Sequence, residues 1–597
     1  MRHRAKLTTA SLAALSALSL VVTGAPAQAD PRATVKNPTA VGSGGAVTSV
    51  DPEATRVGLD VLRKGGNAVD AAVAAAATLG VTEPFSSGIG GGGFFVYYDA
   101  ATGQVQTIDG RETAPAAMDA GSFDGMTFSD AVTSGLSAGV PGTPATWQEA
   151  LDRWGTVSLK DALKGGRQVA NRGFAVDATF RQQIADNADR FNDFTSIRDL
   201  YLPGGQPPAV GSVFRNMDLA ATYNRLGKQG VDWLYDGALA AEIADTVQHP
   251  PVAPDANRDP APGLMTTTDL AAYTAPLREP THVDYRGLDV FGMGPPSSGG
   301  STVGESLNIL DNVDLGAMDR TQALHHYFEA SALSYADRGA YLGDPAAMTA
   351  SLDELLSQGF ADERYCEIDP AAALPKPVAA GDPDGSYDTD CDGADDGAGA
   401  RDHEGLSTTH LTVADRWDNV VSYTLTIEST GGNGIVVPDR GFLLNNELTD
   451  FNFSDGPADD EHANAPGPGK RPRNSMAPTI VLDDGAPFLA LGSPGGSTII
   501  TTVLQMLLNR LDLGMTLPQA LAEPRATQRN TASVQAEPTF DPAQKAALEA
   551  LGHTFTVTPP PGEIGAATAI EFLDDGRLLA AAEPVRRGGG SARVVSP

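Results

Sequence analysis

The chain has 597 residues, of which 75 are acidic and 41 are basic, and its formal net charge at pH 7 is −34. So acidic a surface repels nucleic acid and anionic lipid, which excludes both as expected partners. At roughly 100 to 200 residues per domain the length corresponds to several domains, although one large α/β unit also fits.

The first residues are typical of a secretory signal peptide. Three basic residues within the first six precede an apolar run from Leu12 to Val22, and Ala27-Gln28-Ala29 resembles a cleavage site. The apolar run is shorter than the roughly 20 residues that a membrane-spanning helix needs. We therefore expect residues 1–29 to be removed and the remaining chain to be secreted, without a membrane anchor.

Start signals and hydrophobic periodicity predict helices and strands in the N-terminal half. Asp51, Pro52 and Glu53 supply an N-cap, a proline at the first helical position and an early acid, so a helix should follow and end at Gly65-Gly66. Similar criteria predict further elements: a helix at 68–79, strands at 94–98 and 104–108, and a helix at 323–341.

The segment 369–407 has the composition of a linker. Alanine, proline, glycine and aspartate crowd together there, and apolar periodicity disappears. Cys366 and Cys391, the only cysteines, are expected to form a structural disulfide in an oxidising compartment. Asp388–Gly393 matches the first half of a calcium loop, but Gly399 stands where the loop needs an acid. A disordered acidic linker is the favoured interpretation, and calcium binding stays open.

Beyond the linker the sequence changes to short β-rich runs. The predicted strands are 408–413, 420–427, 441–444, 479–482, 488–491 and 566–572, and the predicted helix is 497–509. Strands and helices on this scale fit a layered α/β/β/α architecture.

Familiar cofactor motifs can be set aside. Gly88–Gly93 matches GxGxxG, but no strand precedes it and a strand follows, so a dinucleotide site is not expected. Gly135–Gly139 matches GxSxG but is predicted to be a loop. The histidines show no metal-binding spacing, and His326 with Glu329 is interpreted as ordinary packing. We expect no metal and no organic cofactor.

The most informative stretch is Ser407-Thr408-Thr409-His410, where the linker gives way to a strand. A threonine hydroxyl is a poor nucleophile without an adjacent base. Cleavage of the bond before Thr408 would free its α-amine to act as that base, with a pKa of about 7.7 to 8.0. Two threonines at the start of a strand are more often explained by β-propensity alone, so this motif needs support from others.

Two other motifs supply that support. Gly492–Ser497 joins a strand to a helix, and the amides of Gly495 and Gly496 are free of side chains that would shield a developing oxyanion. Asn445–Asp450 places two carboxylates in a polar loop, and Arg111 offers a fixed cation. Together, such groups are able to bind the α-carboxylate and α-ammonium of an amino acid.

In combination, these residues resemble the gamma-glutamyltranspeptidases (glutathione hydrolases), which are N-terminal-nucleophile hydrolases. The resemblance runs through residues 66–71, the glycine run before Phe94, and residues 111–115, 140–143, 295–300, 335–338, 408–410, 423–428, 445–450, 475–479 and 493–496. It implies a four-layer α-β-β-α sandwich built from two chains, a large subunit of residues 30–407 and a small catalytic subunit of residues 408–597.

The resemblance also implies a role for each matching residue. The catalytic set is Thr408 as nucleophile, Thr426 as its hydrogen-bonding partner, and Gly495 and Gly496 as the oxyanion hole. The substrate-binding set is Arg111 and Ser475 for the α-carboxylate, Glu428, Glu447 and Asp450 for the α-ammonium, with Thr426 and Gly496 beside them.

Some positions depart from the family pattern. Asn474 stands where the family usually has a serine beside Ser475, which leaves one carboxylate contact open. The loop between Asp450 and Asn474 is shorter than in relatives with a full lid, and it contains no tyrosine. An open cleft that admits larger glutamyl substrates is our hypothesis from this difference.

The implied reaction is self-cleavage followed by transfer of a γ-glutamyl group from glutathione or a related compound to water or an amino acid. Three alternatives share the sequence features. A glutaryl (cephalosporin-type) acylase would use the same nucleophile, and a poly-γ-glutamate depolymerase would suit the short loop. An exported, unprocessed binding protein would keep the fold without catalysis.

Overall fold

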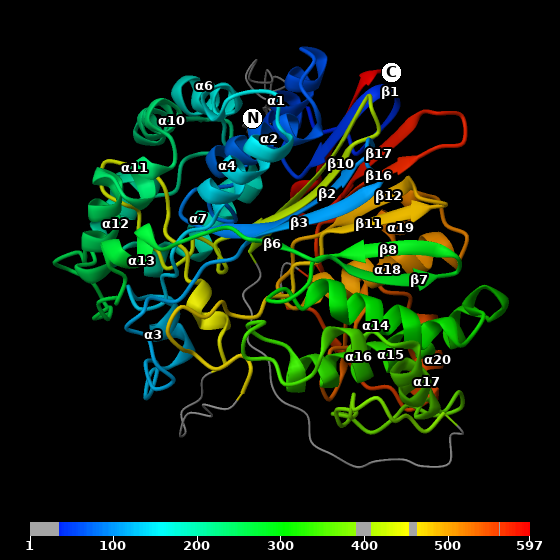
Figure 1. Ribbon diagram of the computed structural model, residues 1–597. Helices are drawn as coiled ribbons and strands as arrows, with labels where there is room; N and C mark the ends of the chain where they lie inside the picture. The colour runs from blue at the N-terminus through cyan, green and yellow to red at the C-terminus, as the bar shows by residue number, and fades with distance from the viewer. Residues whose placement is uncertain (1–34, 390–406, 453–461, 560–561) are drawn as a thin grey trace, which may run out of the picture.

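The computed structural model describes residues 35–389, 407–452, 462–559 and 562–597 (Figure 1). The predicted signal peptide, Cys391 and most of Asp388–Gly393 lie outside the described residues, so the predictions of a signal peptide and of calcium binding stay untested. Cys366 is disulfide-bonded. In the described part of the chain, none of the helices is long and apolar enough to cross a membrane.

The first two helices begin where their capping residues predict. Asp51 caps α1 (Pro52–Arg63), because its Oδ1 accepts a hydrogen bond of 2.8 Å from the amide of Ala54. Asn67 and Asp70 form a reciprocal capping box at the start of α2 (Ala68–Thr82). Every residue of α2 is buried, which explains its alanine-rich composition. Both predicted helices are confirmed.

Within the described residues, thirteen strands form one hydrogen-bonded sheet that has two halves. The first half runs in the order β6 (Leu277–Arg278), β3 (Gln104–Gly110), β2 (Gly92–Asp99), β10 (Val420–Thr426), β9 (Thr408–Asp415) and β1 (Thr39–Ser49), with β18 (Ser591–Ser596) also on β1. The second half continues with β17 (Leu578–Ala582), β16 (Thr568–Phe572), β12 (Ala486–Gly492), β11 (Thr479–Asp483), β8 (Leu288–Gly292) and β7 (Thr281–Tyr285).

Strand β1 joins the two halves. Its residues Thr39–Gly42 pair with β17, and its residues Gly45–Ser49 pair with β9. The halves then pack face to face, with β10 against β12 and β9 against β16. The seam between them is therefore lined by the inner faces of β9 and β10.

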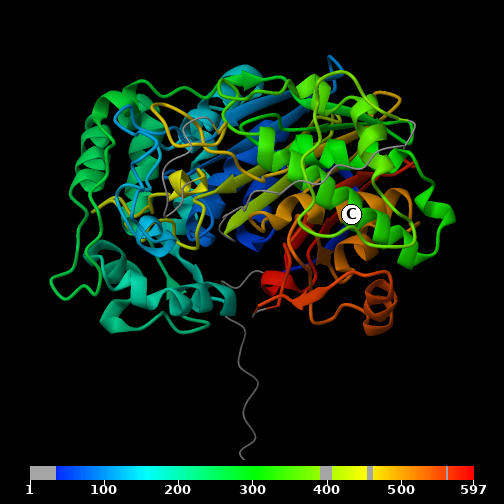
Figure 2. The same ribbon diagram turned by 90° about the horizontal axis from the view of Figure 1, so that it is seen from below.

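Helices cover both outer faces (Figure 1). Helices α1, α2 and α4 (Thr143–Trp154) pack on the first half, and α6 (Lys164–Arg172) packs on α2. The second half is covered by α14 (Gly299–Asp311), α18 (Thr498–Leu511) and α19 (Leu517–Ala522), with α15 (Arg320–Tyr341) on α14. In Figure 2 the orange C-terminal helices lie beside the green helices of residues 299–366. The predicted four-layer α-β-β-α architecture is confirmed.

Shorter elements lie around these layers. The helices are α3 (Phe128–Val132), α5 (Leu159–Ala162), α7 (Ala178–Asp186), α8 (Ala188–Phe191), α9 (Thr195–Tyr201), α10 (Met217–Gln229), α11 (Asp232–Tyr235), α12 (Ala238–Gln248), α13 (Thr267–Ala271), α16 (Leu352–Leu355), α17 (Gln358–Cys366) and α20 (Pro542–Ala550). The strands are β4 (Phe174–Ala175), β5 (Val213–Phe214), β13 (Ala526–Thr527), β14 (Val534–Ala536) and β15 (Phe555–Val557). The 3-10 turns are η1 (Pro203–Gly205), η2 (Leu315–Ala317), η3 (Glu447–Asp450) and η4 (Arg586–Gly588).

One predicted strand is wrong. Residues 441–444 form only an isolated bridge between Leu443 and Val436. Gly441 has a φ of 73°, and an added Cβ there would lie 2.3 Å from Oδ1 of Asn216. Asn216 also donates from Nδ2 to the carbonyl oxygen of Gly441 at 2.7 Å, so the segment is held in this turn and does not extend as a regular strand. The loop predicted at residues 135–139 is confirmed, since they lie outside helices and strands. The strand predicted after the first glycine motif is β2, which begins at Gly92.

Candidate active site

The hairpin of β9 and β10 aligns a row of polar side chains along the seam. Thr408 is opposite Thr426, and His410 is opposite Thr424. Alternate residues of a strand share one face, so these four side chains point the same way. That face is turned toward β12, because an added Cβ on Gly492 would lie 2.3 Å from the His410 ring. Thr408 therefore begins its strand at a buried position between the two halves.

The hydroxyl of Thr426 lies between the two atoms that would react in self-cleavage. It donates a hydrogen bond of 3.1 Å to the carbonyl oxygen of Ser407. It accepts one of 3.4 Å from the hydroxyl of Thr408 and one of 2.8 Å from the amide of Glu428. This arrangement polarises the carbonyl that precedes Thr408 and holds the Thr408 hydroxyl close to it.

The bond before Thr408 is also fixed from its other side. The hydroxyl of Ser407 donates to the carbonyl of Phe85 at 2.8 Å and lies 2.9 Å from the hydroxyl of Ser86. Arg587 donates from Nη2 to Ser86 at 2.8 Å and from Nη1 to the carbonyl oxygen of Thr408 at 2.5 Å. Ser407 and Thr408 are therefore held by groups from three separate parts of the chain.

Sequence reasoning missed Phe85, Ser86 and Arg587. The only local signal was the pair of arginines before Gly588, near the C-terminus of an acidic chain. Arg587 has a φ of 53°, an uncommon conformation for a residue with a side chain. That conformation belongs to the turn η4, which directs its guanidinium toward Ser86 and Thr408.

Three predicted substrate-binding residues come together around a fourth, Arg111, which is completely buried. Its Nη1 donates to Glu447 and its Nη2 donates to Asp450, both from η3. Asn474 donates from Nδ2 to Asp450 Oδ2 at 3.1 Å. Arg111 Nε donates to the carbonyl of Pro472 at 3.0 Å. Both terminal nitrogens of Arg111 are therefore already bonded to acids.

Glu428 is linked to the residues around Arg111 through the side chain of Asn446. Its Oε2 accepts a hydrogen bond of 2.6 Å from Ser429 and another from the amide of Asn446, the residue before η3. Glu428 has a φ of 73°, which costs free energy in a residue with a side chain and is typical of functional sites. The backbone of Glu428 contacts Thr426, and its side chain reaches toward the Arg111 group.

Ser475, Gly495 and Gly496, the remaining predicted residues, make no hydrogen bond to Arg111 or Thr408 among the described residues. Ser475 accepts a hydrogen bond of 2.9 Å from Arg338 Nη2 and none from Arg111 among the described residues. Gly495 and Gly496 have φ of 144° and 55° and precede α18. No hydrogen bond within the described residues joins either glycine to Thr408. They follow β12, whose last residue packs on His410, so they lie at the seam.

Burial raises the pKa of two acids beside Arg111. Glu112 is buried, and neither of its carboxylate oxygens has a hydrogen bond among the described residues, although Oε2 lies 3.6 Å from Arg111 Nη1. Burial, opposed by Arg111, raises the pKa of Glu112 to about 8. Burial, opposed by Arg111 and reinforced by Glu112 and Glu428, also raises the pKa of Glu447 well above its ordinary range. A bound ammonium group would favour the ionised form of these acids.

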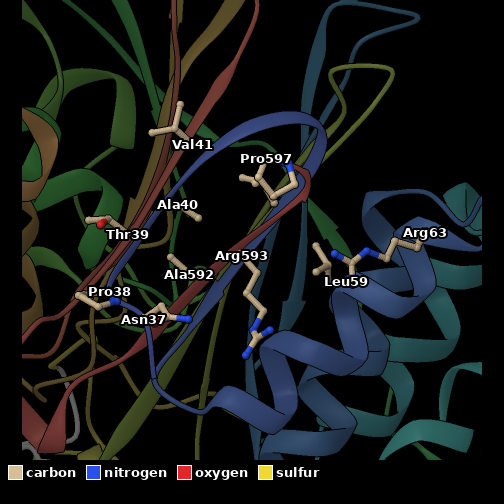
Figure 3. Close-up of a pocket in the computed structure, with 11 residues that line it drawn as sticks. Asn37, Pro38, Thr39, Ala40, Val41, Leu59, Arg63, Ala592, Arg593 and Pro597 are labelled. Carbon is tan, nitrogen blue, oxygen red and sulfur yellow. The ribbon is translucent and has the colours of Figure 1, made fainter. Parts of the chain in front are cut away.

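A separate hollow of about 390 Å³ lies beside β1, β18 and α1 (Figure 3). Its lining includes Thr39, Arg63 and Arg593, and neither Thr408 nor Arg111 belongs to it. Among the described residues, one group of side chains has the composition of a metal site, and it also lies elsewhere: His325, Glu329 and His553.

The fold and the position of Thr408 define a class, the N-terminal-nucleophile hydrolases. The solved cephalosporin acylase from Bacillus halodurans superposes with a TM-score of 0.82 at 28% identity, covering 96% of this chain and 99% of that one. The chain belongs to the gamma-glutamyltranspeptidase family, which matches residues 54–593. It is an enzyme of that family, as its sequence motifs predicted.

Two curated relatives show the breadth of the family. The chain is 39% identical over 556 residues to the glutathione hydrolase proenzyme of Bacillus subtilis (strain 168), covering 92% of this chain and 91% of that one. It is 34% identical over 573 residues to the Acylase ACY 1 proenzyme of Pseudomonas sp. (strain SE83), covering 93% and 96%. Both names describe proenzymes, and they differ in the substrate class they imply.

Proposed function

We propose that this protein is a secreted γ-glutamyl-transferring enzyme that first cleaves its own Ser407–Thr408 bond. The observation that carries the proposal is the Thr426 hydroxyl, which lies 3.1 Å from the Ser407 carbonyl oxygen and 3.4 Å from the Thr408 hydroxyl. Thr408 Oγ attacks the Ser407 carbonyl carbon, and the C–N bond breaks to leave an ester and a free amine. Water then hydrolyses the ester, giving chains of residues 30–407 and 408–597.

The freed amine of Thr408 is then the general base for its own hydroxyl. Thr408 Oγ attacks the γ-carbonyl of a donor such as glutathione, and the amides of Gly495 and Gly496 stabilise the oxyanion. The leaving amine takes up a proton, and a γ-glutamyl ester of Thr408 remains. Water or the amine of an amino acid resolves that ester, which restores the threonine. No metal or organic cofactor takes part.

The pocket around Arg111 favours a γ-glutamyl donor over a glutaryl amide. A γ-glutamyl group carries both an α-carboxylate and an α-ammonium, whereas a glutaryl group has no ammonium. Glu447 and Asp450 bind Arg111 directly. Their carboxylates are the hydrogen-bond acceptors that a substrate ammonium group would require. The relatives named as acylases keep the glutaryl alternative worth testing. The proposal of an open cleft for poly-γ-glutamate rests on a loop that lies partly outside the described residues.

The first experiment compares wild type with Thr408→Ala on a denaturing gel, with N-terminal sequencing of each band. We expect two wild-type bands, one beginning near Asp30 and one at Thr408, and a single band for the variant. Thr408→Ser is the matched control, because it keeps a hydroxyl and should still cut. An intact wild-type chain would contradict self-cleavage and leave the unprocessed binding protein. A larger wild-type band that retains residues 1–29 after export would contradict the predicted signal peptide.

The second experiment measures kcat/KM of the processed enzyme for γ-glutamyl-p-nitroanilide and glutaryl-p-nitroanilide. We expect the γ-glutamyl substrate to be preferred. Comparable or higher activity on the glutaryl substrate would instead support the acylase alternative. Adding an amino acid to the γ-glutamyl assay then separates transfer from hydrolysis, since transfer gives a new γ-glutamyl product.

A further inference from the structure

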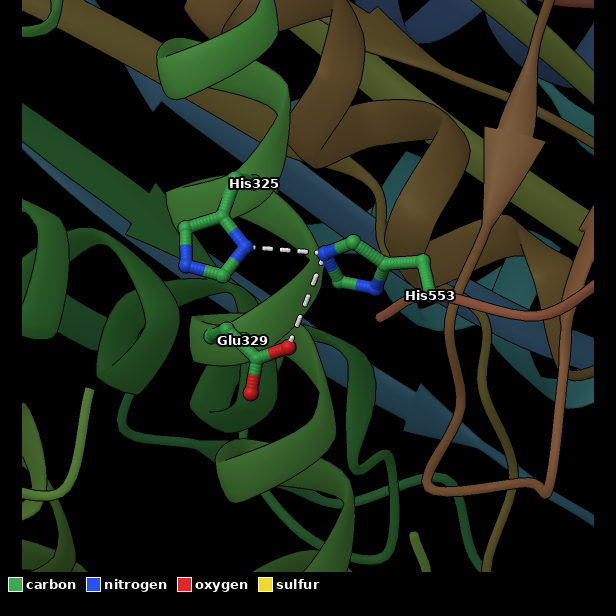
Figure 4. A group of neighbouring side chains, drawn as sticks. All are labelled: His325, Glu329 and His553. Atoms are coloured by element: carbon green, nitrogen blue, oxygen red, sulfur yellow. Dashed lines mark hydrogen bonds and ion pairs between the residues drawn. The ribbon is translucent and has the colours of Figure 1, made fainter. Parts of the chain in front are cut away.

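A second group of buried titratable side chains lies apart from Thr408 and Arg111. His325 and Glu329 lie one turn apart on α15, His553 follows α20, and the three side chains point toward one another (Figure 4). His325 Nδ1 is 2.8 Å from His553 Nε2, which is 3.8 Å from Glu329 Oε1. All three residues are buried, and one ligand atom from each lies within 4.8 Å of the other two.

The contacts around this group leave ligand atoms facing inward. His325 Nε2 lies 2.8 Å from the carbonyl oxygen of Asp369. A carbonyl only accepts, so Nε2 carries the hydrogen and the lone pair of Nδ1 is directed at His553 Nε2, where a metal ion would replace the hydrogen shared by the two rings. A histidine that donates its outer N–H to a carbonyl is the usual arrangement at metal sites. Glu329 Oε1 is buried and has no hydrogen-bond partner among the described residues.

We propose that His325, Glu329 and His553 bind a divalent transition-metal ion, with Zn²⁺ as the expected occupant. Two imidazoles and one carboxylate, with water in the fourth position, form a ligand set that suits this ion. Tetrahedral bonds of about 2.0 to 2.1 Å place ligand atoms about 3.3 Å apart. The separations of 2.8 and 3.8 Å lie on either side of that value. Shifts of about half an ångström would bring these two separations to that value. The third pair, His325 and Glu329, has its ligand atoms within 4.8 Å of each other.

Lys376 is the cation that competes with such an ion. Its Nζ lies 2.6 Å from Glu329 Oε2, on the carboxylate oxygen that faces away from the histidines. A metal ion on Oε1 would share the carboxylate with this ammonium and be repelled by it. Removing the Lys376 charge should therefore strengthen metal binding, whereas removing a ligand should abolish it. These opposite effects distinguish a metal site from a hydrogen-bonded histidine pair.

The proposed ion would connect the two sides of the Ser407–Thr408 bond. His325 and Glu329 precede that bond in the sequence, and His553 follows it. The metal site does not depend on the proposed cleavage, but this consequence does. After cleavage, one ion would hold the large and small chains together at a point remote from the nucleophile.

The test is a titration of the metal-free full-length protein with Co²⁺, followed by its visible d–d absorption and by competition with Zn²⁺. We expect saturable binding of one ion per chain. His553→Gln and Glu329→Gln should weaken binding by more than the roughly 10- to 100-fold that loss of an outer-shell partner costs. His326→Gln is the matched control, because His326 is buried on the same helix but bonds to the carbonyl of Gln322 at 2.8 Å.

Lys376→Met supplies the gain-of-binding variant. We expect it to bind Co²⁺ more tightly than wild type, and Zn²⁺ to raise its thermal unfolding temperature by a larger amount. The titration is repeated on uncut Thr408→Ala, where binding should equal that of wild type whether or not self-cleavage is correct. Absence of saturable Co²⁺ absorption in wild type overturns the proposal, and so does equal binding by wild type and folded His553→Gln.

Discussion

Replacing Thr426 by valine tests whether one hydroxyl drives self-cleavage. Valine keeps the branched shape that suits the end of β10 but removes the donor that lies 3.1 Å from the Ser407 carbonyl oxygen. That oxygen gains negative charge when Thr408 attacks. Loss of one preorganised donor to such an oxyanion costs about 2.7 to 4 kcal/mol, or roughly 100- to 1,000-fold in rate. We expect Thr426→Val to cut slower by about that factor.

The assay is the half-time for conversion of freshly purified, uncut protein into two bands. Thr426→Ser is the control, since it restores the hydroxyl and should cut at close to the wild-type rate. Valine also leaves the buried amide of Glu428 without its acceptor, which costs about 1 to 3 kcal/mol of stability. Denaturant unfolding of both variants in the Thr408→Ala background measures that cost separately. Cleavage of folded Thr426→Val within tenfold of wild type would refute the reasoning.

Three further predictions concern charged groups of the site. Arg587→Ala removes a charge-assisted hydrogen bond to the carbonyl of Thr408, worth about 1.5 to 3 kcal/mol, so self-cleavage should slow by about 10- to 150-fold in a gel time course. The exposed Arg577→Ala should cut normally, and equal rates for both variants would contradict the role of Arg587. Asp450→Asn should lower kcat/KM for γ-glutamyl-p-nitroanilide by a similar factor and affect glutaryl-p-nitroanilide less; equal losses would mean that Asp450 does not receive the ammonium. For Glu112, burial raises the folded-state pKa from 4.5 to about 8, so this group reduces the stability of the fold as pH rises through that window. Glu112→Gln should therefore be more stable than its parent at pH 8, by on the order of a few kcal/mol, and gain little at pH 4. Urea unfolding at both pH values in the Thr408→Ala background measures the difference, and a gain of the same size at each pH would contradict it.

The pairing of Thr408 with Thr426 could be predicted from the sequence. Two β-rich runs flank a polar turn around Trp417, which lies midway between the two threonines. An antiparallel hairpin centred there must place them opposite each other, as the register shows. Local periodicity and turn chemistry were enough for this part of the site, because the contact is formed within one hairpin.

Contacts between distant segments could not be predicted in this way. Arg587 reaches Thr408 from 179 residues away, and no periodic pattern links the two. His553 meets His325 across 228 residues, so the histidine spacing gave no sign of the group. The prediction of a strand at 441–444 was wrong for the same reason, because a residue distant in the sequence, Asn216, packs against Gly441. Long-range packing decides these positions, and a single sequence does not record it.

The charges around Arg111 give a physical reason for preferring a γ-glutamyl substrate. Arg111 already binds Glu447 and Asp450, so a substrate carboxylate enters only by displacing one of them. An α-ammonium on the same substrate then pairs with the displaced acid, and every buried charge keeps a partner. A glutaryl group would displace the acid without providing that cation. It would leave a buried carboxylate unpaired, which costs several kcal/mol unless the acid takes up a proton. Selectivity would therefore follow from an exchange of partners, and we expect binding of glutaryl amides to weaken as pH rises, because protonation of the displaced acid then becomes harder.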